Sequence, residues 1–299
     1  MSGPVAKPRL HLVDGTLELF RAHFSRRPAH SAPGGLEAKA TIGVAASILA
    51  LLHDETEAVT HLGVAFGNPL RSFRHELFAG YKTDEGVPAE VRAQLGPVEE
   101  AVRALGVVVW SVDRWEADDA LATAAARFRD GFSQVRILTP DKDLGQSLRG
   151  RSVVQVDRLR QKEIDAASVL LSKGVEPSSL PDLVALLGDA EDGIPGLPGI
   201  GEKTAATLLR RYHHLDAIPD DPARWDVEVR GATKIAATLR AERPAALLYR
   251  TLATLVEDVP LPQTVAAELR FAGVPRAAFT AWCDRMGVPG LKTRPTRWM

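Results

Sequence analysis

The stretch VVVWSVDRWEADDALATAA, residues 107–125, is the part of the sequence that most directly indicates the fold. Its apolar beginning, VVVWSV, is typical of a strand buried on both faces of a sheet. A short polar connection follows, and three acidic residues within 116–119 then lead into an alanine-rich run. Acidic side chains favour the first turn of a helix, where they face the positive end of the helix dipole. The stretch therefore predicts a buried strand followed by a helix that begins near Glu116.

The same alternation of strand and helix extends over the first part of the chain. Strand-like runs occur at 10–14, 59–66, 135–140 and 152–156, and helix-like runs at 35–55 and 97–106. Strands separated by helices predict an α/β fold with a mostly parallel sheet that is flanked by helices on both faces. From about residue 178, short helical segments joined by Gly/Pro turns replace the strands.

These patterns predict three regions. We expect an α/β domain over 1–177, a helical region over 178–265, and a C-terminal extension over 266–299 whose role the sequence does not indicate. The end of that extension, 287–299, is expected to be irregular or loosely held.

The composition limits the class of protein. The chain has 299 residues, a net charge of −1 and a single cysteine, Cys283, so neither a disulfide framework nor a metal site with several thiolates is expected. No apolar run reaches the roughly 20 residues of a membrane span, and the N-terminus lacks the apolar core of a signal peptide. A cytoplasmic location without a membrane partner is therefore expected. Because the net charge is close to zero, nucleic acid would have to bind to local basic patches.

Acidic residues recur after the predicted strands. Asp14 ends the first strand, Glu116, Asp118 and Asp119 follow the strand at 107–112, Asp141 and Asp143 follow 135–140, and Asp189 and Asp192 lie in GDAEDG after a helical run. Parallel strands end at the same edge of a sheet, which is where such folds bind ligands. Clustered carboxylates repel one another unless cations or protons neutralise them. Mg²⁺ prefers oxygen ligands, and two such ions can assist phosphodiester cleavage.

Each acidic motif also has a purely structural explanation. Asp14 could cap the helix that follows it, the DKD sequence at 141–143 could be a capped loop, and GDAEDG could be a polar turn. These alternatives stay open for each motif taken alone. Their joint occurrence favours a metal site.

A Gly/Pro-rich segment, GIPGLPGIGEKTAATLLRRY at 193–212, precedes an amphipathic helix. Glycines let backbone N–H groups approach a phosphate, and a helix N-terminus favours an anion. Lys203, Arg210 and Arg211 add positive charge, although the spacing is not that of a P-loop. A tight turn between packed helices is the alternative. We favour contact with the DNA backbone, which positions a duplex without reading its sequence.

Taken together, these motifs resemble those of bacterial 5′–3′ exonucleases and flap endonucleases, including the 5′-nuclease domain of bacterial DNA polymerase I. The matching stretches are LVDGTLELFRAHF, FRHELFAGYK, WEADDALA, TPDKDLGQ, LLGDAEDGIPGLPGIGEKTAATLL, VRGATKIAATL and LATLVEDVPL. They occur in the family's order over roughly 10–262. No polymerase segment follows them, so a free-standing nuclease is expected.

The resemblance implies a PIN-like domain with an attached helix–three-turn–helix module, and it implies roles for individual residues. Asp14, Glu116 and Asp118 would bind a first metal ion, with Asp119 beside it, and Asp141, Asp143 and Asp192 would bind a second, supported by Asp189. Both ions would be Mg²⁺, which Mn²⁺ could replace. Lys82 and Arg21 would contact the scissile phosphate.

The resemblance also implies the partner. The substrate would be DNA with 5′ ends, flaps or single-strand/duplex junctions, and the helical module would grip the duplex with a bound K⁺ ion. The residues expected to contact DNA are Arg71, Arg74, Gly196, Gly199, Gly201, Lys203 and Thr204.

Two departures from the family pattern affect the expected site. Gly67 stands where the family usually has an aspartate of the first metal site, and Glu85 stands near the place of a common arginine, in a segment where Asp84 adds further negative charge. We therefore expect weaker binding of the first metal and a higher demand for divalent ions. A structure-selective DNA binder with weak or no cleavage is the main alternative, and an RNA-directed nuclease of the broader PIN class is a second.

Overall fold

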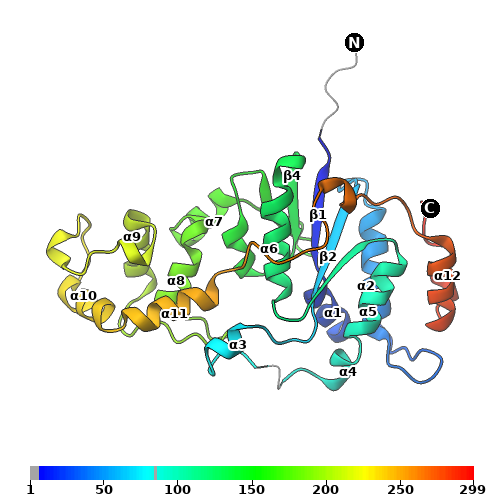
Figure 1. The fold of residues 1–299 in the computed structure, drawn as a ribbon, viewed down its shortest axis with the longest axis horizontal. Coiled ribbons are helices and arrows are strands. Elements are labelled where there is room, and N and C mark those ends of the chain that lie inside the picture. The colour runs from blue at the N-terminus through cyan, green and yellow to red at the C-terminus, as the bar shows by residue number, and fades with distance from the viewer. Residues whose placement is uncertain (1–6, 84–85) are drawn as a thin grey trace, which may run out of the picture. The chain divides into compact units, whose positions relative to one another are not determined.

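The structure, a computed structural model, describes residues 7–83 and 86–299 (Figure 1). The strands are β1 (Arg9–Asp14), β2 (His61–Gly67), β3 (Val108–Val112), β4 (Gln134–Leu138), β5 (Val153–Asp157) and β6 (Lys162–Ile164). The helices are α1 (Gly15–Phe24), α2 (Lys39–Leu52), α3 (Arg74–Leu77), α4 (Ala89–Arg92), α5 (Leu95–Ala104), α6 (Ala117–Phe128), α7 (Ala166–Lys173), α8 (Leu180–Leu187), α9 (Glu202–Tyr212), α10 (Ala232–Ala241), α11 (Arg243–Ala253) and α12 (Arg276–Arg285). A 3-10 helix, η2, spans Lys142–Ser147.

The chain forms two compact units. The first unit comprises Met1–Ser72, Asp84–Thr139 and Glu257–Met299, and the second comprises Phe73–Thr83 and Pro140–Val256. Each unit thus combines segments that lie far apart in the sequence.

The first unit is built on parallel strands in the order β3-β2-β1-β4. The inner strand β1 is buried along Leu10–Asp14, because it has a neighbour on either side and helices above and below. Its Val13 lies opposite Val64 of β2 and Leu138 of β4. This register places the ends of β1, β2 and β4 at one edge of the sheet.

Helices cover the strands of the first unit. Helix α6 packs along β1, β2 and β3, whereas α2 packs against α1 and α5, and Figure 1 shows α6 and the pair α2 and α5 on opposite sides of β1 and β2. Helix α1 starts directly at the end of β1. The start is possible because residue 15 is glycine: a Cβ there would lie 2.5 Å from the ring of Phe66 and 2.8 Å from the carbonyl oxygen of Ala65.

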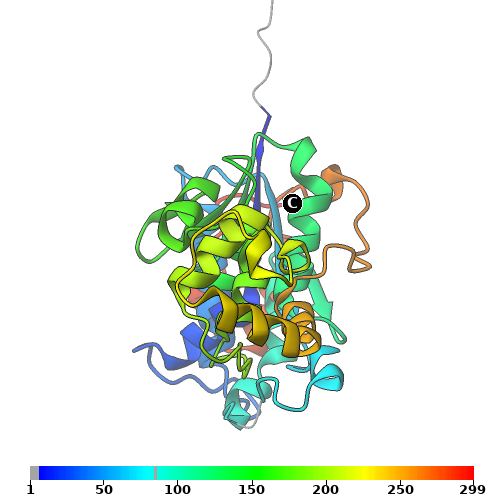
Figure 2. The same ribbon diagram turned by 90° about the vertical axis from the view of Figure 1, so that its left-hand side faces the viewer.

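The second unit contains the antiparallel pair β5 and β6 and a cluster of helices. Figure 2 shows the helices α9, α10 and α11 toward the viewer. The buried core formed by α8 to α11 includes Leu183, Leu186, Leu208, Leu209, Leu239 and Ala246. The apolar faces of α8 to α11 therefore meet in a core of their own, as expected for short amphipathic helices.

The predicted mostly parallel α/β fold with an added helical region is confirmed, and the predicted strands match β1 to β5 within about two residues at each end. Strand β6 and helices α7 and α12 were not anticipated. The segment 287–299 is largely irregular, as expected, but it is not loosely held: Met299 and Val274 are joined by a backbone hydrogen bond of 3.0 Å, and the Arg276 guanidinium lies 4.3 Å from the centre of the Trp298 ring. The predicted domain boundaries stay a prediction.

A buried charged group joins β1 and β4 in the first unit. His11 and Arg136 are opposite each other in the register, and both contact Glu57. The His11 ring lies 2.9 Å from Glu57 Oε2, and Arg136 donates two hydrogen bonds, of 2.7 and 3.0 Å, to the same carboxylate. The hydrogen bond with His11, together with the Arg136 guanidinium, outweighs the effect of burial and lowers the pKa of Glu57 to about 2.

This lowered pKa predicts a pH-dependent contribution to stability. Because the folded-state pKa lies below the unfolded one, Glu57 stabilises the fold above about pH 4.5, and this stabilisation is lost as the pH falls toward 2. Glu57→Gln should lower the free energy of unfolding at pH 7 by roughly 2 kcal/mol. Denaturant titrations from pH 7 to pH 3 should show the difference from wild type shrinking. A pH-independent difference would contradict the prediction, and exposed Glu55→Gln is the control.

Candidate active site

Asp14 lies at the edge of the sheet in the first unit, where β1 ends. It is 4% exposed. Its Oδ1 accepts a hydrogen bond of 2.8 Å from the backbone N–H of Leu17, and its Oδ2 accepts one of 3.2 Å from the Thr139 hydroxyl at the end of β4. The structural explanation of Asp14 as a helix cap is therefore correct. Each carboxylate oxygen has two lone pairs, so capping does not exclude metal binding.

Helix α6 begins where the acidic motif predicted it. Glu116 is the N-cap, and its Oε1 accepts a 2.8 Å hydrogen bond from the Ser72 hydroxyl. Asp119 is fully buried, and its Oδ2 accepts a 2.9 Å hydrogen bond from the backbone N–H of Glu116. Asp118, in the same turn, is partly exposed. Glu116 and Asp119 thus cap the helix reciprocally, and Asp118 is the acidic residue of the motif that takes no part in this capping box.

Gly67 ends β2 next to these residues. Its backbone N–H donates a 3.0 Å hydrogen bond to the Thr16 hydroxyl. The nearest atoms to a Cβ at this position would be the Ala117 nitrogen at 3.7 Å and the Thr16 hydroxyl at 4.0 Å, which are ordinary contact distances. The backbone therefore has room for a side chain here, directed at the start of α6.

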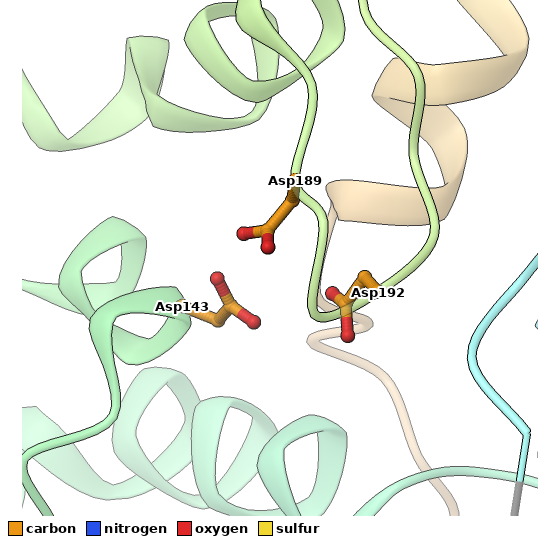
Figure 3. A group of neighbouring side chains, drawn as sticks. All are labelled: Asp143, Asp189 and Asp192. Atoms are coloured by element: carbon orange, nitrogen blue, oxygen red, sulfur yellow. The ribbon is translucent and has the colours of Figure 1, made fainter.

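The second unit brings three of the predicted acidic residues together (Figure 3). Asp143 comes from η2, and Asp189 and Asp192 come from the loop after α8. Each offers a carboxylate oxygen, and these oxygens lie within 4.8 Å of one another. Among the described residues, 7–83 and 86–299, no other group of three His, Cys, Asp or Glu side chains has its ligand atoms this close together. Asp14, Glu116 and Asp118 do not form a second one.

The loop that carries Asp189 and Asp192 is closed by two backbone hydrogen bonds of 2.8 Å between Asp189 and Ile194. Gly193 has a φ of +70°, and a Cβ there would lie 2.1 Å from the carbonyl oxygen of Gly80. Only glycine allows this approach, which also brings the Lys82 N–H to 2.9 Å from the carbonyl oxygen of Asp192.

Burial and like charges set the electrostatics of the acidic group. Asp189 and Asp192 are each 9% exposed. Burial, followed by the negative charges of Asp141 and Asp192, raises the pKa of Asp143 to about 7. A buried all-oxygen group with this much repulsion fits a hard divalent cation. Asp141 is not part of this close group; its Oδ1 accepts a 2.9 Å hydrogen bond from the Asp143 N–H and caps η2.

Two lysines approach the same carboxylates. Lys82 Nζ lies 3.0 Å from Asp192 Oδ1. Lys142 Nζ lies 2.7 Å from Asp189 Oδ2 and 2.7 Å from Glu191 Oε2. Although burial opposes it, hydrogen bonding to Asp189 and Glu191 raises the pKa of Lys142 above its ordinary value. Lys142 was not among the predicted site residues, although its position between Asp141 and Asp143 could have indicated it.

The predicted arginines differ in their surroundings. Arg74 is 1% exposed, and it donates hydrogen bonds of 2.7 and 2.9 Å to the carbonyl oxygens of Leu252 and Thr254 at the end of α11. These carbonyls lack intrahelical partners and hold the guanidinium inside the second unit. The expected DNA contact of Arg74 stays a prediction, which this burial does not favour. Arg71 is exposed. Arg21 donates a 3.0 Å hydrogen bond to Glu18, whose other oxygen accepts one from Ser47.

The Gly/Pro-rich segment leads into α9 as expected. Gly196 has a φ of +70° and lies against the backbone of Leu187 and Gly188, where a Cβ would be only 2.4 Å from backbone atoms. Glycine is therefore required at this position for backbone packing. Gly199, Gly201 and Lys203 are exposed around the start of α9, and Thr204 is half-buried there. The structure thus leaves the N-terminus of α9 accessible. Asp84 and Glu85, the predicted source of opposing charge, lie outside the described residues.

Two family descriptions account for most of the chain. Residues 9–174 match the family described as "5′-3′ exonuclease, N-terminal resolvase-like domain", and residues 175–276 match "5′-3′ exonuclease, C-terminal SAM fold". The chain belongs to the 5′–3′ exonuclease family. The predicted family and the predicted enzyme class, a 5′–3′ nuclease, are thereby confirmed.

Similar proteins include much longer polymerases. DNA polymerase I of Mycobacterium leprae is 36% identical over 263 residues, which are 86% of this chain and 28% of that protein. DNA polymerase I of Bacillus caldotenax is 32% identical over 285 residues, 94% of this chain and 32% of that protein. The chain therefore spans about a third of the length of these relatives or less.

Solved structures share the fold at low sequence identity. The T5 D15 protein co-crystallised with metal ions matches with a TM-score of 0.65 and 20% identity, over 83% of this chain and 89% of that one. The catalytic core of Rad2 in complex with a DNA substrate matches with a TM-score of 0.58 and 16% identity, over 97% and 93%. In the part of the chain that the structure describes, no helix has the length and hydropathy needed to cross a bilayer.

The space at Gly67 yields a test of the first metal site. Gly67→Asp should add a carboxylate ligand and tighten divalent-ion binding in the first unit about tenfold, equivalent to roughly 1.4 kcal/mol. Mn²⁺ titration followed by calorimetry measures this, in a chain that also carries Asp143→Asn so that the other acidic group does not interfere. Gly67→Asn, which has the same size without the charge, is the matched control. Equal affinities for the Asp and Gly chains would refute the assignment.

Proposed function

We propose that this chain hydrolyses DNA phosphodiesters near 5′ ends and single-strand/duplex junctions, as a 5′–3′ exonuclease and 5′-flap endonuclease. The observation that carries the proposal is the group formed by Asp143, Asp189 and Asp192, with Lys82 bound to it, in a member of the 5′–3′ exonuclease family. Solved structures of the same fold include a T5 flap endonuclease with DNA and metal ions, and human GEN1 with Holliday junction DNA. Their substrates support a structure-selective nuclease. The cytoplasmic location stays a prediction.

Two Mg²⁺ ions, replaceable by Mn²⁺, are part of the proposal. Asp14, Glu116 and Asp118 would bind the first ion, and Asp143, Asp189 and Asp192, with Asp141 close by, would bind the second. When bound, such a pair of ions activates a water molecule and stabilises the leaving 3′ oxygen of a phosphodiester. The fit rests on the donor set, since all these side chains offer the oxygen atoms that Mg²⁺ prefers.

The protein's own residues would orient the phosphate. Lys82 is held beside the acidic group by its ion pair with Asp192, so its ammonium is in place to balance charge that develops on the phosphate. Arg21 presents a guanidinium that Glu18 fixes on α1. Thr139 and Ser72 orient the carboxylates of Asp14 and Glu116 through their hydroxyl groups.

The start of α9 would bind the duplex. Gly199, Gly201, Lys203 and Thr204 surround this helix N-terminus, which favours phosphate oxygens. A K⁺ ion between this loop and the DNA backbone is part of the proposal. Contacts of this kind position the duplex without reading its sequence, so selectivity would arise from the shape of the junction.

A structure-selective DNA binder with weak or no cleavage remains the second candidate. It is favoured by Gly67, which supplies no carboxylate, and by the absence of a close acidic group around Asp14 within the residues that the structure describes. A cleavage assay on 5′-flap DNA separates the nuclease from the binder.

The decisive experiment is cleavage of a labelled 5′-flap DNA in Mg²⁺ or Mn²⁺. We expect metal-dependent release of the flap, and Asp143→Asn should slow it about 100-fold or more, because the loss of one metal is worth several kcal/mol. Glu176→Gln, an exposed change in the same unit, is the control. Tight flap binding without metal-dependent cleavage would replace the nuclease by the binder. Faster cleavage of the matching RNA flap would indicate an RNA-directed nuclease instead.

The duplex contact makes a separate prediction. Lys203→Ala should weaken binding of a DNA duplex similarly for all sequences and reduce the slope of log affinity against log salt by about 1, because one phosphate contact is lost. Fluorescence anisotropy at several salt concentrations measures this. An unchanged slope would mean that Lys203 makes no phosphate contact, and Lys234→Ala on the next helix gives the comparison.

A further inference from the structure

Each aspartate of the loop after α8 has its own lysine. Lys82 pairs with Asp192 at 3.0 Å, and Lys142 pairs with Asp189 at 2.7 Å. Lys142 is the more unusual, because it lies between Asp141 and Asp143 and also reaches Glu191. Its ammonium therefore links η2 to the loop through two carboxylates. Figure 3 shows how closely the three aspartates of this group face one another.

A divalent cation and the Lys142 ammonium would compete for the same negative charge. Asp189 belongs to the group of three acids and is also the partner of Lys142. Like charges a few ångströms apart repel strongly where solvent is partly excluded. Binding of a cation by Asp189 therefore favours departure of the lysine, whose long flexible side chain allows it to move.

The surroundings of Lys142 offer it a second position. It lines an open cavity of about 610 Å³, whose walls also include Asp143, Asp189 and the start of α9 at Gly201 and Glu202. The side chain is about half exposed, so it can turn within the cavity. The N-terminus of α9 favours phosphate. The cavity thus connects the acidic group with the place where a DNA phosphate would lie.

We propose that Lys142 is an exchangeable counter-ion of the acidic group: it neutralises Asp189 and Glu191 while no divalent ion is bound, and it turns to a DNA phosphate in this cavity once one is. This inference rests on the proposed function, since it takes the acidic group to be a metal site. It makes metal binding and DNA binding cooperative, because DNA gives the displaced ammonium a new anionic partner.

The test is Mn²⁺ binding to the full chain without DNA, measured by calorimetry. Lys142→Met removes the competing charge and should tighten Mn²⁺ binding about tenfold, whereas damage to the fold would weaken it. Lys142→Arg keeps the charge and should bind Mn²⁺ like wild type. Lys173→Met is the matched control, since Lys173 lines the same cavity and has no ion pair within the described part of the chain. Equal or weaker binding by Lys142→Met would overturn the inference.

Two further measurements complete the test. Asp143→Asn should abolish Mn²⁺ binding by the acidic group. If it does, and Lys142→Met still binds Mn²⁺ no more tightly than wild type, only the counter-ion role of Lys142 fails. If Asp143→Asn binds Mn²⁺ like wild type, the acidic group is not the metal site, and both proposals fail. In the second measurement, Mn²⁺ should increase the affinity for a flap duplex with non-hydrolysable linkages less in Lys142→Met than in wild type. An equal increase would contradict the phosphate contact.

Discussion

The repulsion between neighbouring carboxylates is the constraint on which the candidate site depends. Asp143, Asp189 and Asp192 are held close together and largely away from water, and the raised pKa of Asp143 expresses the free-energy cost. The chain offsets this cost locally: Lys82 and Lys142 supply positive charge, and backbone N–H groups donate to Asp141 and Asp189. A site of this kind is prepared for cations because its own folding already requires them or a substitute.

The first unit handles its acidic residues differently. Asp14 and Asp119 accept hydrogen bonds from helix N-termini, and hydroxyl groups of Thr139 and Ser72 hold Asp14 and Glu116. Hydrogen bonds from neutral donors orient a carboxylate without cancelling its charge. These carboxylates keep their negative charge, and among the described residues they do not form a close group like that of the second unit.

Much of this arrangement could be predicted from the sequence, because periodicity and motif order are local or linear signals. Strand β3 and helix α6 follow directly from the pattern at 107–125, and the acidic residues after each strand were found by their position. The burial of Arg74 could not be predicted, since it depends on carbonyl groups at 252–254, far away in the sequence. The pairing of Lys142 with Asp189 was missed for the same reason. Periodicity also could not show that residues 257–299 return to the first unit.

The segment at 252–255 has a consequence for how the second unit forms. Arg74 holds the carbonyl oxygens of Leu252 and Thr254, and Gln146 of η2 holds the carbonyl oxygen of Ala253 and the N–H of Leu255. Helix α3, which precedes the loop with Lys82, and η2, which contains Asp143, are thus both hydrogen-bonded to the same four residues. Residues 252–255 are also synthesised after all three aspartates of the acidic group. A chain that ended before Leu252 would contain all of these aspartates but would lack the hydrogen bonds by which this segment holds Arg74 and Gln146.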